Sequence, residues 1–313
     1  FIAVAELLIL MPGADAAHAQ GRLSARHVRL LATAQKTAPE AYADDEEWLL
    51  ARAHELNFAD FAKVVNVNLV GTFNMLRAVR DFAPNCQRFL YASSDAVYWS
   101  AAGLNACYLP VDEAHPRTAG SIYGAVKVGC EELCHTFSRA WGLPVTVLRF
   151  GATANADELI QPRGRFALWL FLRRAIEVLA ANPAPSPADM ESLRILQSLD
   201  NGTEQLLVMA EMDGKPEVRQ WADARDLADG CVRALQTPAA AGETFNLGGA
   251  APFTSEEQVC HMVDRLGLPY VTACLPISRK PWYISSAKAR GLLGYAPQWT
   301  IFRMVDDALA RQA

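Results

Sequence analysis

The 313-residue chain has no excess of positive charge, since 29 lysines and arginines stand against 34 aspartates and glutamates. Nucleic-acid binding needs clustered lysine and arginine to neutralise phosphates, so this balance argues against a nucleic-acid partner. A few local arginines would still be enough to bind an anionic small molecule. The apolar stretch at residues 1–11 is interrupted by Glu6 and is shorter than the roughly 20 residues of a membrane span. We therefore expect no membrane insertion.

Paired cysteines are also missing. The seven cysteines are scattered, and Cys130 and Cys134 are not followed by a second pair with zinc-ligand spacing. This pattern predicts buried free thiols in a reducing compartment, and no metal site. The apolar start of the chain has no basic segment before it, as a secretory signal would. We expect a cytoplasmic protein whose N-terminus is incomplete in this sequence.

One pair of side chains points to acid/base chemistry. Of the eight tyrosines, only Tyr123 is followed by a lysine four residues later, Lys127. At helical spacing these two positions share a face, which brings the ammonium near the phenol. A nearby cation favours the phenolate and lowers the pKa of a tyrosine, which near 10 is a poor base at neutral pH.

A hydroxyl-bearing strand end lies upstream of this pair. The apolar run Phe89–Ala92 predicts a buried parallel strand, and Ser93 and Ser94 follow it directly. Open α/β sheets bind ligands just beyond the carboxyl ends of their strands, so both hydroxyls are candidates for a site. Alternatively, Ser94 caps the local backbone. The surrounding segments alternate between helix and strand, which predicts a doubly wound α/β sheet: helices 59–80 and 121–141, and a strand at 144–149.

These segments resemble the extended short-chain dehydrogenase/reductase family, the NAD-dependent epimerase/dehydratase group typified by UDP-glucose 4-epimerase. The matches run in the family's order from about residue 60 to the C-terminus. They are Asn68-x-x-Gly71-Thr72, Ser93-Ser94-x-x-Val97-Tyr98, Ser121-x-Tyr123-Gly124-x-x-Lys127, Leu148-Arg149, Arg219 with Asp226 to Gly230, Gly242 to Gly249, and Ser286 to Pro297. Seven collinear matches are much more specific than any one alone.

The resemblance implies a Rossmann-type domain over residues 1–150 and a smaller substrate lobe over 151–313, with 219–250 returning to the main sheet. It implies NAD or NADP as cofactor and Ser94, Tyr123 and Lys127 as catalytic residues. Tyr123 would move the proton of a substrate hydroxyl, Lys127 would support it and Ser94 would align the substrate oxygen. Asn68 and Ser93, together with Tyr123 and Lys127, are the implied cofactor contacts, although Ser93 fits a structural role better.

The implied substrate is a sugar or a nucleotide sugar, and Arg219 matches an arginine that contacts the nucleotide diphosphate in sugar epimerases. The planar guanidinium suits this role because it can engage two phosphate oxygens. One departure weakens the nucleotide-sugar assignment: Ala152 stands where these enzymes usually place an asparagine. The family also implies a homodimer through helices 59–80 and 121–141, for which Phe73, Leu76 and Phe137 supply apolar side chains.

Residues 1–60 contain no Gly-x-x-Gly-x-x-Gly turn, the loop whose amide groups hold the cofactor pyrophosphate. Residues 1–3 are a weak candidate for the end of that motif, and 27–34 for a later strand. We therefore predict that the chain binds NAD(H) weakly or not at all. Two alternatives to an epimerase or dehydratase stay open: a simple sugar or sugar-acid dehydrogenase, and a non-catalytic scaffold that has lost its cofactor loop.

Beyond Arg149 the pattern is less regular. It predicts helices at 166–180, 190–199, 224–235, 255–266 and 301–310, and two short strands, 205–210 and 217–221, that form a hairpin around Asp213-Gly214.

Overall fold

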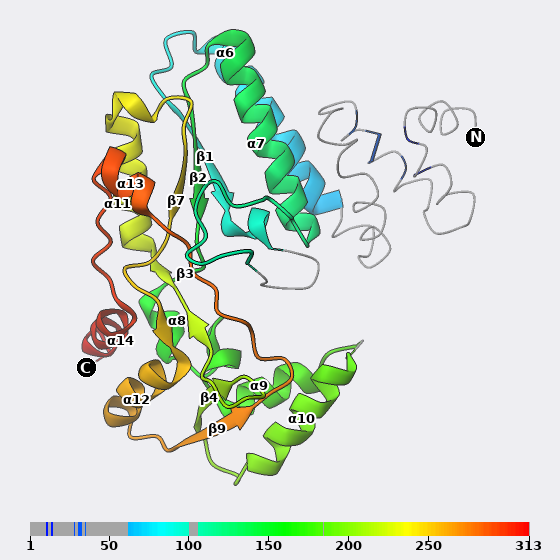
Figure 1. Ribbon diagram of the computed structural model, residues 1–313, viewed down its shortest axis with the longest axis vertical. Helices are drawn as coiled ribbons and strands as arrows, with labels where there is room; N and C mark the ends of the chain where they lie inside the picture. The colour runs from blue at the N-terminus through cyan, green and yellow to red at the C-terminus, as the bar shows by residue number, and fades with distance from the viewer. Residues whose placement is uncertain are drawn as a thin grey trace. The chain divides into compact units, whose positions relative to one another are not determined.

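The structure is a computed structural model that describes residues 62–99, 106–183 and 185–312, together with Met11, Ala14, Val28, Leu31, Ala32 and Gln35. The chain divides into two compact units (Figure 1). The first comprises residues 1–103, 114–149 and 234–245, and the second comprises 104–113, 150–233 and 246–313.

A three-stranded sheet organises the first unit, with the strand order β1 (Phe89–Ser94), β2 (Val145–Phe150) and β7 (Thr244–Leu247). The helix α7 (Ile122–Trp141) connects the neighbouring strands β1 and β2 (Figure 1). A helix between adjacent strands is the βαβ connection of a parallel sheet. This arrangement confirms the α/β Rossmann-type fold that the sequence predicts. Strand β2 is buried along its first five residues, whereas β1 is only partly buried.

The helices of the first unit form where the apolar spacing predicts them. The π-helix η1 (Val65–Val70) leads directly into α6 (Gly71–Phe82). The Oγ atom of Ser121 accepts a hydrogen bond from the Gly124 amide and begins α7, and Gly142 ends it with a φ of 67°. Helices and sheet enclose one apolar core, which includes Leu69, Leu76, Val126, Phe137 and Val147.

The second unit consists of short strand pairs with helices. β3 (Thr153–Ala154) pairs in parallel with β6 (Ala222–Asp223), and β4 (Leu206–Ala210) pairs in parallel with β9 (Tyr270–Cys274). β5 (Val218–Arg219) pairs antiparallel with β8 (Phe253–Thr254). The helices that begin in this unit are α8 (Ala156–Ile160), α9 (Leu172–Ala180), α10 (Pro187–Leu199), α11 (Ala224–Gln236), α12 (Ser255–Leu266), α13 (Ala287–Leu293) and α14 (Ile301–Ala310).

Several local predictions need correction. Residues 166–180 form a short 3₁₀ helix, η3 (Ala167–Trp169), and then α9, rather than one helix. The predicted hairpin around Asp213-Gly214 is reduced to a single antiparallel bridge between Ala210 and Pro216. The strand predicted at 217–221 is shortened to β5, which pairs with β8, and the Glu217 amide donates a 3.0 Å hydrogen bond to the Met209 carbonyl oxygen of β4.

Two further predictions are wrong in part. Val28, Leu31 and Ala32, the described residues of the range 27–34, are helical, which contradicts the suggested strand at these three positions. Residues 1–3 lie outside the described residues. All seven cysteines are free, but only Cys130 and Cys134 are buried; Cys86, Cys231 and Cys274 are partly buried, and Cys107 and Cys260 are exposed.

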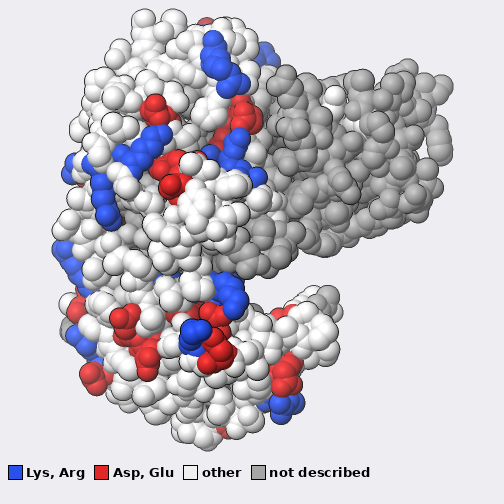
Figure 2. Space-filling view, viewed as in Figure 1, with Lys and Arg blue, Asp and Glu red and all other residues white. Residues whose placement is uncertain are grey.

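The surface agrees with the balanced composition. On the face shown in Figure 2, acidic and basic side chains are interspersed among the described residues. None of the described helices combines the length and the apolar character that crossing a membrane requires.

Candidate active site

Lys127 is held at the carboxyl end of β1. Its Nζ atom donates a 2.7 Å hydrogen bond to the carbonyl oxygen of Ala92. The same atom lies 5.6 Å from the ring centre of Tyr123 and 5.0 Å from that of Tyr91. Burial lowers the pKa of Lys127, and the nearby Cys130 and Glu131 oppose that effect. The helix therefore places the ammonium against the Tyr123 ring, as the spacing predicts.

Tyr123 lies where α7 approaches the turn after β1. This turn is the 3₁₀ helix η2 (Asp95–Tyr98), which packs against α7. A Cβ atom built on Gly124 would lie 2.5 Å from the carbonyl oxygen of Ala96, so only glycine permits this approach. The Tyr123 side chain is 43% exposed and is accessible to a ligand.

Ser94 begins the same turn. Its Oγ atom accepts a 3.2 Å hydrogen bond from the Ala96 amide and donates a 3.4 Å hydrogen bond to Asp95. The capping role considered from the sequence is therefore present. Because the Ala96 backbone also meets Gly124, the structure brings Ser94 and the Tyr123-bearing turn of α7 to one region.

Ser93 points the other way, into a buried polar network. Its hydroxyl donates a 2.6 Å hydrogen bond to Glu131, which is 0% exposed. Glu131 also accepts two hydrogen bonds from Arg149 and one from Arg117. Burial raises the pKa of Glu131, but the hydrogen bonds and charge of Arg149 outweigh it and hold that pKa below its usual range. Ser93 thus belongs to the packing that joins β1, β2 and α7.

Asn68 lies within the π-helix η1. Its Nδ2 atom donates a 3.1 Å hydrogen bond to the carbonyl oxygen of Val64, and its own carbonyl oxygen accepts a hydrogen bond from Cys130. Single π-turns inside longer helices are frequent at functional sites, since they reorient nearby side chains and carbonyl groups. The sequence pattern gave no sign of this irregular turn.

Arg219 belongs to the second unit and is buried. Its Nε and Nη2 atoms both donate to Glu217, at 2.9 and 2.6 Å, and Nη1 donates to the carbonyl oxygen of Trp169. The guanidinium is therefore engaged within the protein. A diphosphate contact by Arg219 stays a prediction, and it would have to compete with Glu217.

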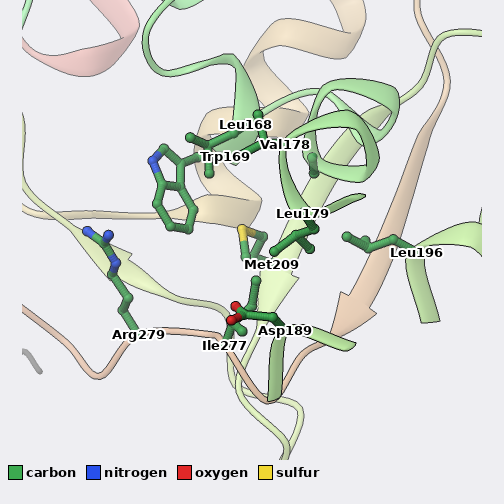
Figure 3. Close-up of a pocket in the computed structure, with 10 residues that line it drawn as sticks. Leu168, Trp169, Val178, Leu179, Asp189, Leu196, Met209, Ile277 and Arg279 are labelled. Carbon is green, nitrogen blue, oxygen red and sulfur yellow. The ribbon is translucent and has the colours of Figure 1, made fainter. Parts of the chain in front are cut away.

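The second unit contains a cavity that sequence reasoning missed. Its volume is about 250 Å³, and Trp169, Met209 and Leu179 surround it (Figure 3). Two of its lining residues are charged, Asp189 and Arg279, and the Arg279 guanidinium lies 4.3 Å from the Trp169 ring centre. The sequence shows which residues of α9 are apolar, but only the packing of these residues in the folded chain shows that a cavity is left between them.

No cluster of potential metal ligands occurs within the described part of the chain.

Comparisons with known proteins show which families this chain is similar to. The family model described as GDP-mannose 4,6 dehydratase matches residues 55–158. The dTDP-glucose 4,6-dehydratase of Xanthomonas campestris pv. campestris is 26% identical over 272 residues, which cover 79% of this chain and 67% of that protein. The UDP-glucose 4-epimerase of Rhizobium meliloti is 25% identical over 265 residues, covering 80% and 70%. The chain spans 62% of a second Xanthomonas dehydratase.

Among solved structures, a short-chain dehydrogenase/reductase superfamily protein from Agrobacterium tumefaciens, crystallised with bound NAD, is 31% identical. The match covers 81% of this chain and 75% of that one, with a TM-score of 0.73. This chain therefore belongs to the short-chain dehydrogenase/reductase superfamily, in its extended branch. A dTDP-glucose 4,6-dehydratase from Bacillus anthracis, 20% identical with a TM-score of 0.53, shares the fold.

Proposed function

We propose that the protein is an NAD(P)-dependent oxidoreductase of the epimerase/dehydratase type that acts on a hydroxyl of a sugar or nucleotide sugar. One observation carries the proposal: the Lys127 ammonium lies against the Tyr123 ring at the strand end that leads into the Ser94 turn. The relatives support it, because dTDP-glucose dehydratases, a UDP-glucose epimerase and an NAD-bound superfamily protein all match this chain.

The residues of the first unit fit the nicotinamide end of such a cofactor. A lysine ammonium has three N–H donors, and the hydrogen bond to Ala92 uses one of them. The remaining donors can bind ribose hydroxyls, and the exposed Tyr123 ring is accessible beside them. A pyrophosphate site in residues 1–60 falls almost entirely outside the described residues, so the weak NAD(H) binding expected from the missing glycine turn stays a prediction.

The proposed mechanism assigns one task to each side chain. Tyr123 accepts the proton of the substrate hydroxyl, and the adjacent Lys127 ammonium favours the phenolate that this step needs. Ser94 donates its hydroxyl hydrogen to the substrate oxygen, giving up its bond to Asp95. The bound nicotinamide supplies the hydride chemistry. In an epimerase or dehydratase the cofactor is restored within each cycle.

Ala152 favours a second candidate, a simple sugar or sugar-acid dehydrogenase. Its side chain packs against the apolar cluster of the second unit, and its carbonyl oxygen accepts a hydrogen bond from the Ala222 amide. A methyl group at this position offers no amide to a sugar diphosphate. A dehydrogenase would release one NADH per turnover, whereas an epimerase would release none, so the stoichiometry separates these candidates.

The deciding experiment compares Tyr123→Phe with the unchanged protein and with Tyr270→Phe, which changes a tyrosine of similar exposure on β9. Each is incubated with millimolar NAD or NADP and with UDP-glucose, UDP-glucuronate, dTDP-glucose, GDP-mannose or free sugars. NADH is followed by absorbance, and sugar products are followed by NMR. We expect Tyr123→Phe to lower turnover roughly 10²–10⁴-fold, the usual contribution of a general acid/base group, while Tyr270→Phe leaves it unchanged.

Equal turnover by Tyr123→Phe and the unchanged protein would contradict the assigned role of Tyr123. No turnover of any substrate by a folded unchanged protein would instead favour the non-catalytic scaffold.

A further inference from the structure

The Lys127 ammonium lies near two aromatic rings, and only one of them belongs to the Tyr123–Lys127 pair that the sequence indicates. Tyr123 is four residues earlier on α7, whereas Tyr91 is on β1. The Nζ atom is 5.0 Å from the Tyr91 ring centre and 5.6 Å from the Tyr123 ring centre. Both distances fall within the ~6 Å at which a ring face attracts a cation.

Tyr91 and Ala92 are consecutive residues, so a single stretch of β1 supplies both a ring and a carbonyl oxygen to the same ammonium. Burial takes this ammonium partly out of water and lowers the pKa of Lys127. One carbonyl bond satisfies only one of its three N–H groups. The electron-rich face of a buried ring compensates for some of the lost hydration.

The hydroxyl of Tyr91 does not take part in this contact as a base. The side chain is buried, and burial together with the neighbouring Cys130 thiol raises the pKa of Tyr91. A raised pKa keeps the phenol protonated at neutral pH. Its ring is the part that faces Lys127.

Other ionisable groups also surround Lys127, on α7 itself and on the elements that pack against it. On α7 they are Cys130, Glu131 and Cys134, which act on the ammonium in the direction opposite to burial. Glu131 is itself bound by Arg149. The remaining ionisable side chains on the elements packed against α7 are Asp95 and Tyr98 on η2 and Arg77, Arg80 and Asp81 on α6.

We propose that Tyr91 is a positioning residue, whose ring, together with the Ala92 carbonyl, holds the Lys127 ammonium against the Tyr123 ring. The proposal rests on the proposed function only for its catalytic consequence. The placement of the ammonium is a property of the folded first unit and is tested without turnover.

The test compares Tyr91→Phe, which keeps the ring, with Tyr91→Leu and Tyr91→Met, which keep apolar bulk without a ring. The chain has six lysines, the others being Lys36, Lys63, Lys215, Lys280 and Lys288. Carbon-13 labelling of lysine therefore gives few NMR signals, and Lys127→Arg assigns the one of interest. Each folded variant is titrated with pH, and its thermal melting is recorded.

We expect Lys127 to titrate at the same pKa in Tyr91→Phe as in the unchanged protein. In Tyr91→Leu and Tyr91→Met its pKa should fall by a further ~0.5–1, because a cation–π contact of this kind is lost. In an active protein these two variants should lower kcat with KM nearly unchanged, and Tyr91→Phe should retain kcat. If Tyr91 had only a structural role, the Lys127 pKa and kcat would not depend on whether the variant keeps an aromatic ring.

An unchanged Lys127 pKa in a folded Tyr91→Leu or Tyr91→Met protein would overturn the proposal. So would a Tyr91→Phe protein that behaves like Tyr91→Leu, since the hydroxyl would then be the important group. If the pKa changes as expected but no variant has activity, the placement of Lys127 holds and the proposed function fails.

Discussion

At the scale of single residues, Glu131 is a fully buried carboxylate next to the candidate site. It accepts hydrogen bonds from Ser93 on β1, from Arg149 on β2 and from Arg117 in the loop before α7. Arg149 donates in turn to the Tyr98 hydroxyl at the end of η2. One carboxylate thus ties together the strand that ends in Ser94 and the helix that carries Tyr123 and Lys127.

Replacement of Glu131 by Gln should destabilise the protein by about 3–5 kcal/mol, because it leaves the buried Arg149 charge without its counter-ion. Denaturant unfolding measures this loss. The double variant Glu131→Leu with Arg149→Leu is the control, and its loss should be smaller than the sum of the single-variant losses. If the double variant instead loses as much stability as the two single variants together, Glu131 and Arg149 are not coupled.

The same carboxylate predicts a dependence of stability on pH. The pKa of Glu131 is lower in the folded protein than its ordinary value of 4.5. Its stabilising contribution is therefore complete above that ordinary value and is lost as the pH falls through the lower folded value. The free energy of unfolding of Glu131→Gln should therefore fall less steeply at acidic pH than that of the unchanged protein.

At the scale of elements, the close approach of α7 to η2 determines where Tyr123 lies. Gly124→Ala should force these two elements apart, since its Cβ would meet the Ala96 carbonyl at 2.5 Å and backbone cannot yield as a flexible side chain does. Overpacking of this kind typically costs ~1–3 kcal/mol, and here it should also lower turnover. Thermal melting and the activity assay measure both effects.

Gly291 provides the matched control for that substitution. It lies inside α13, and a Cβ atom there would meet nothing within 4 Å. Gly291→Ala should therefore be neutral or stabilising by up to ~1 kcal/mol, the usual gain in a helix interior. If Gly124→Ala were equally harmless, the approach of α7 to η2 would not be as tight as the structure describes.

At the scale of the whole molecule, the homodimer remains a prediction. The residues that the sequence suggested for its interface need correction. Phe73, Leu76 and Phe137 belong to the apolar core of the first unit rather than to a free surface. Exposed apolar side chains on η1, α6 and α7 include Val67, Met75, Phe82 and Trp141. They still fit an interface with a second copy, because a two-fold contact uses the same face of both subunits.

Light scattering should accordingly find a dimer, and Met75→Lys should weaken it by burying an unpaired charge. Met212→Lys is the control, since Met212 is 64% exposed and Met75 58%, but Met212 lies in the second unit. A monomer at high concentration, or equal weakening by the two lysine variants, would rule out this interface.

Residues 121–141, 255–266 and 301–310 could be predicted as helices because their ends are encoded locally. Ser121 and Thr300 cap their helices, Thr254 and Glu257 form a capping box, and Gly142 takes the left-handed conformation that ends α7. The Tyr123–Lys127 pair was predictable for the same reason, since i and i+4 neighbours on a helix need no other part of the chain.

Interactions between distant segments carried no such local signal. Glu131 and Arg149 are 18 residues apart and meet only because α7 packs on β2. The two-residue strands of the second unit and the cavity beside Trp169 likewise follow from packing. The sequence by itself therefore determined where most of the helices lie, and it supplied the side chains that we propose for the chemistry. Tertiary structure alone decided which polar groups are engaged by partners and that Tyr91 shares the Lys127 ammonium, because burial and long-range contacts exist only in the folded chain.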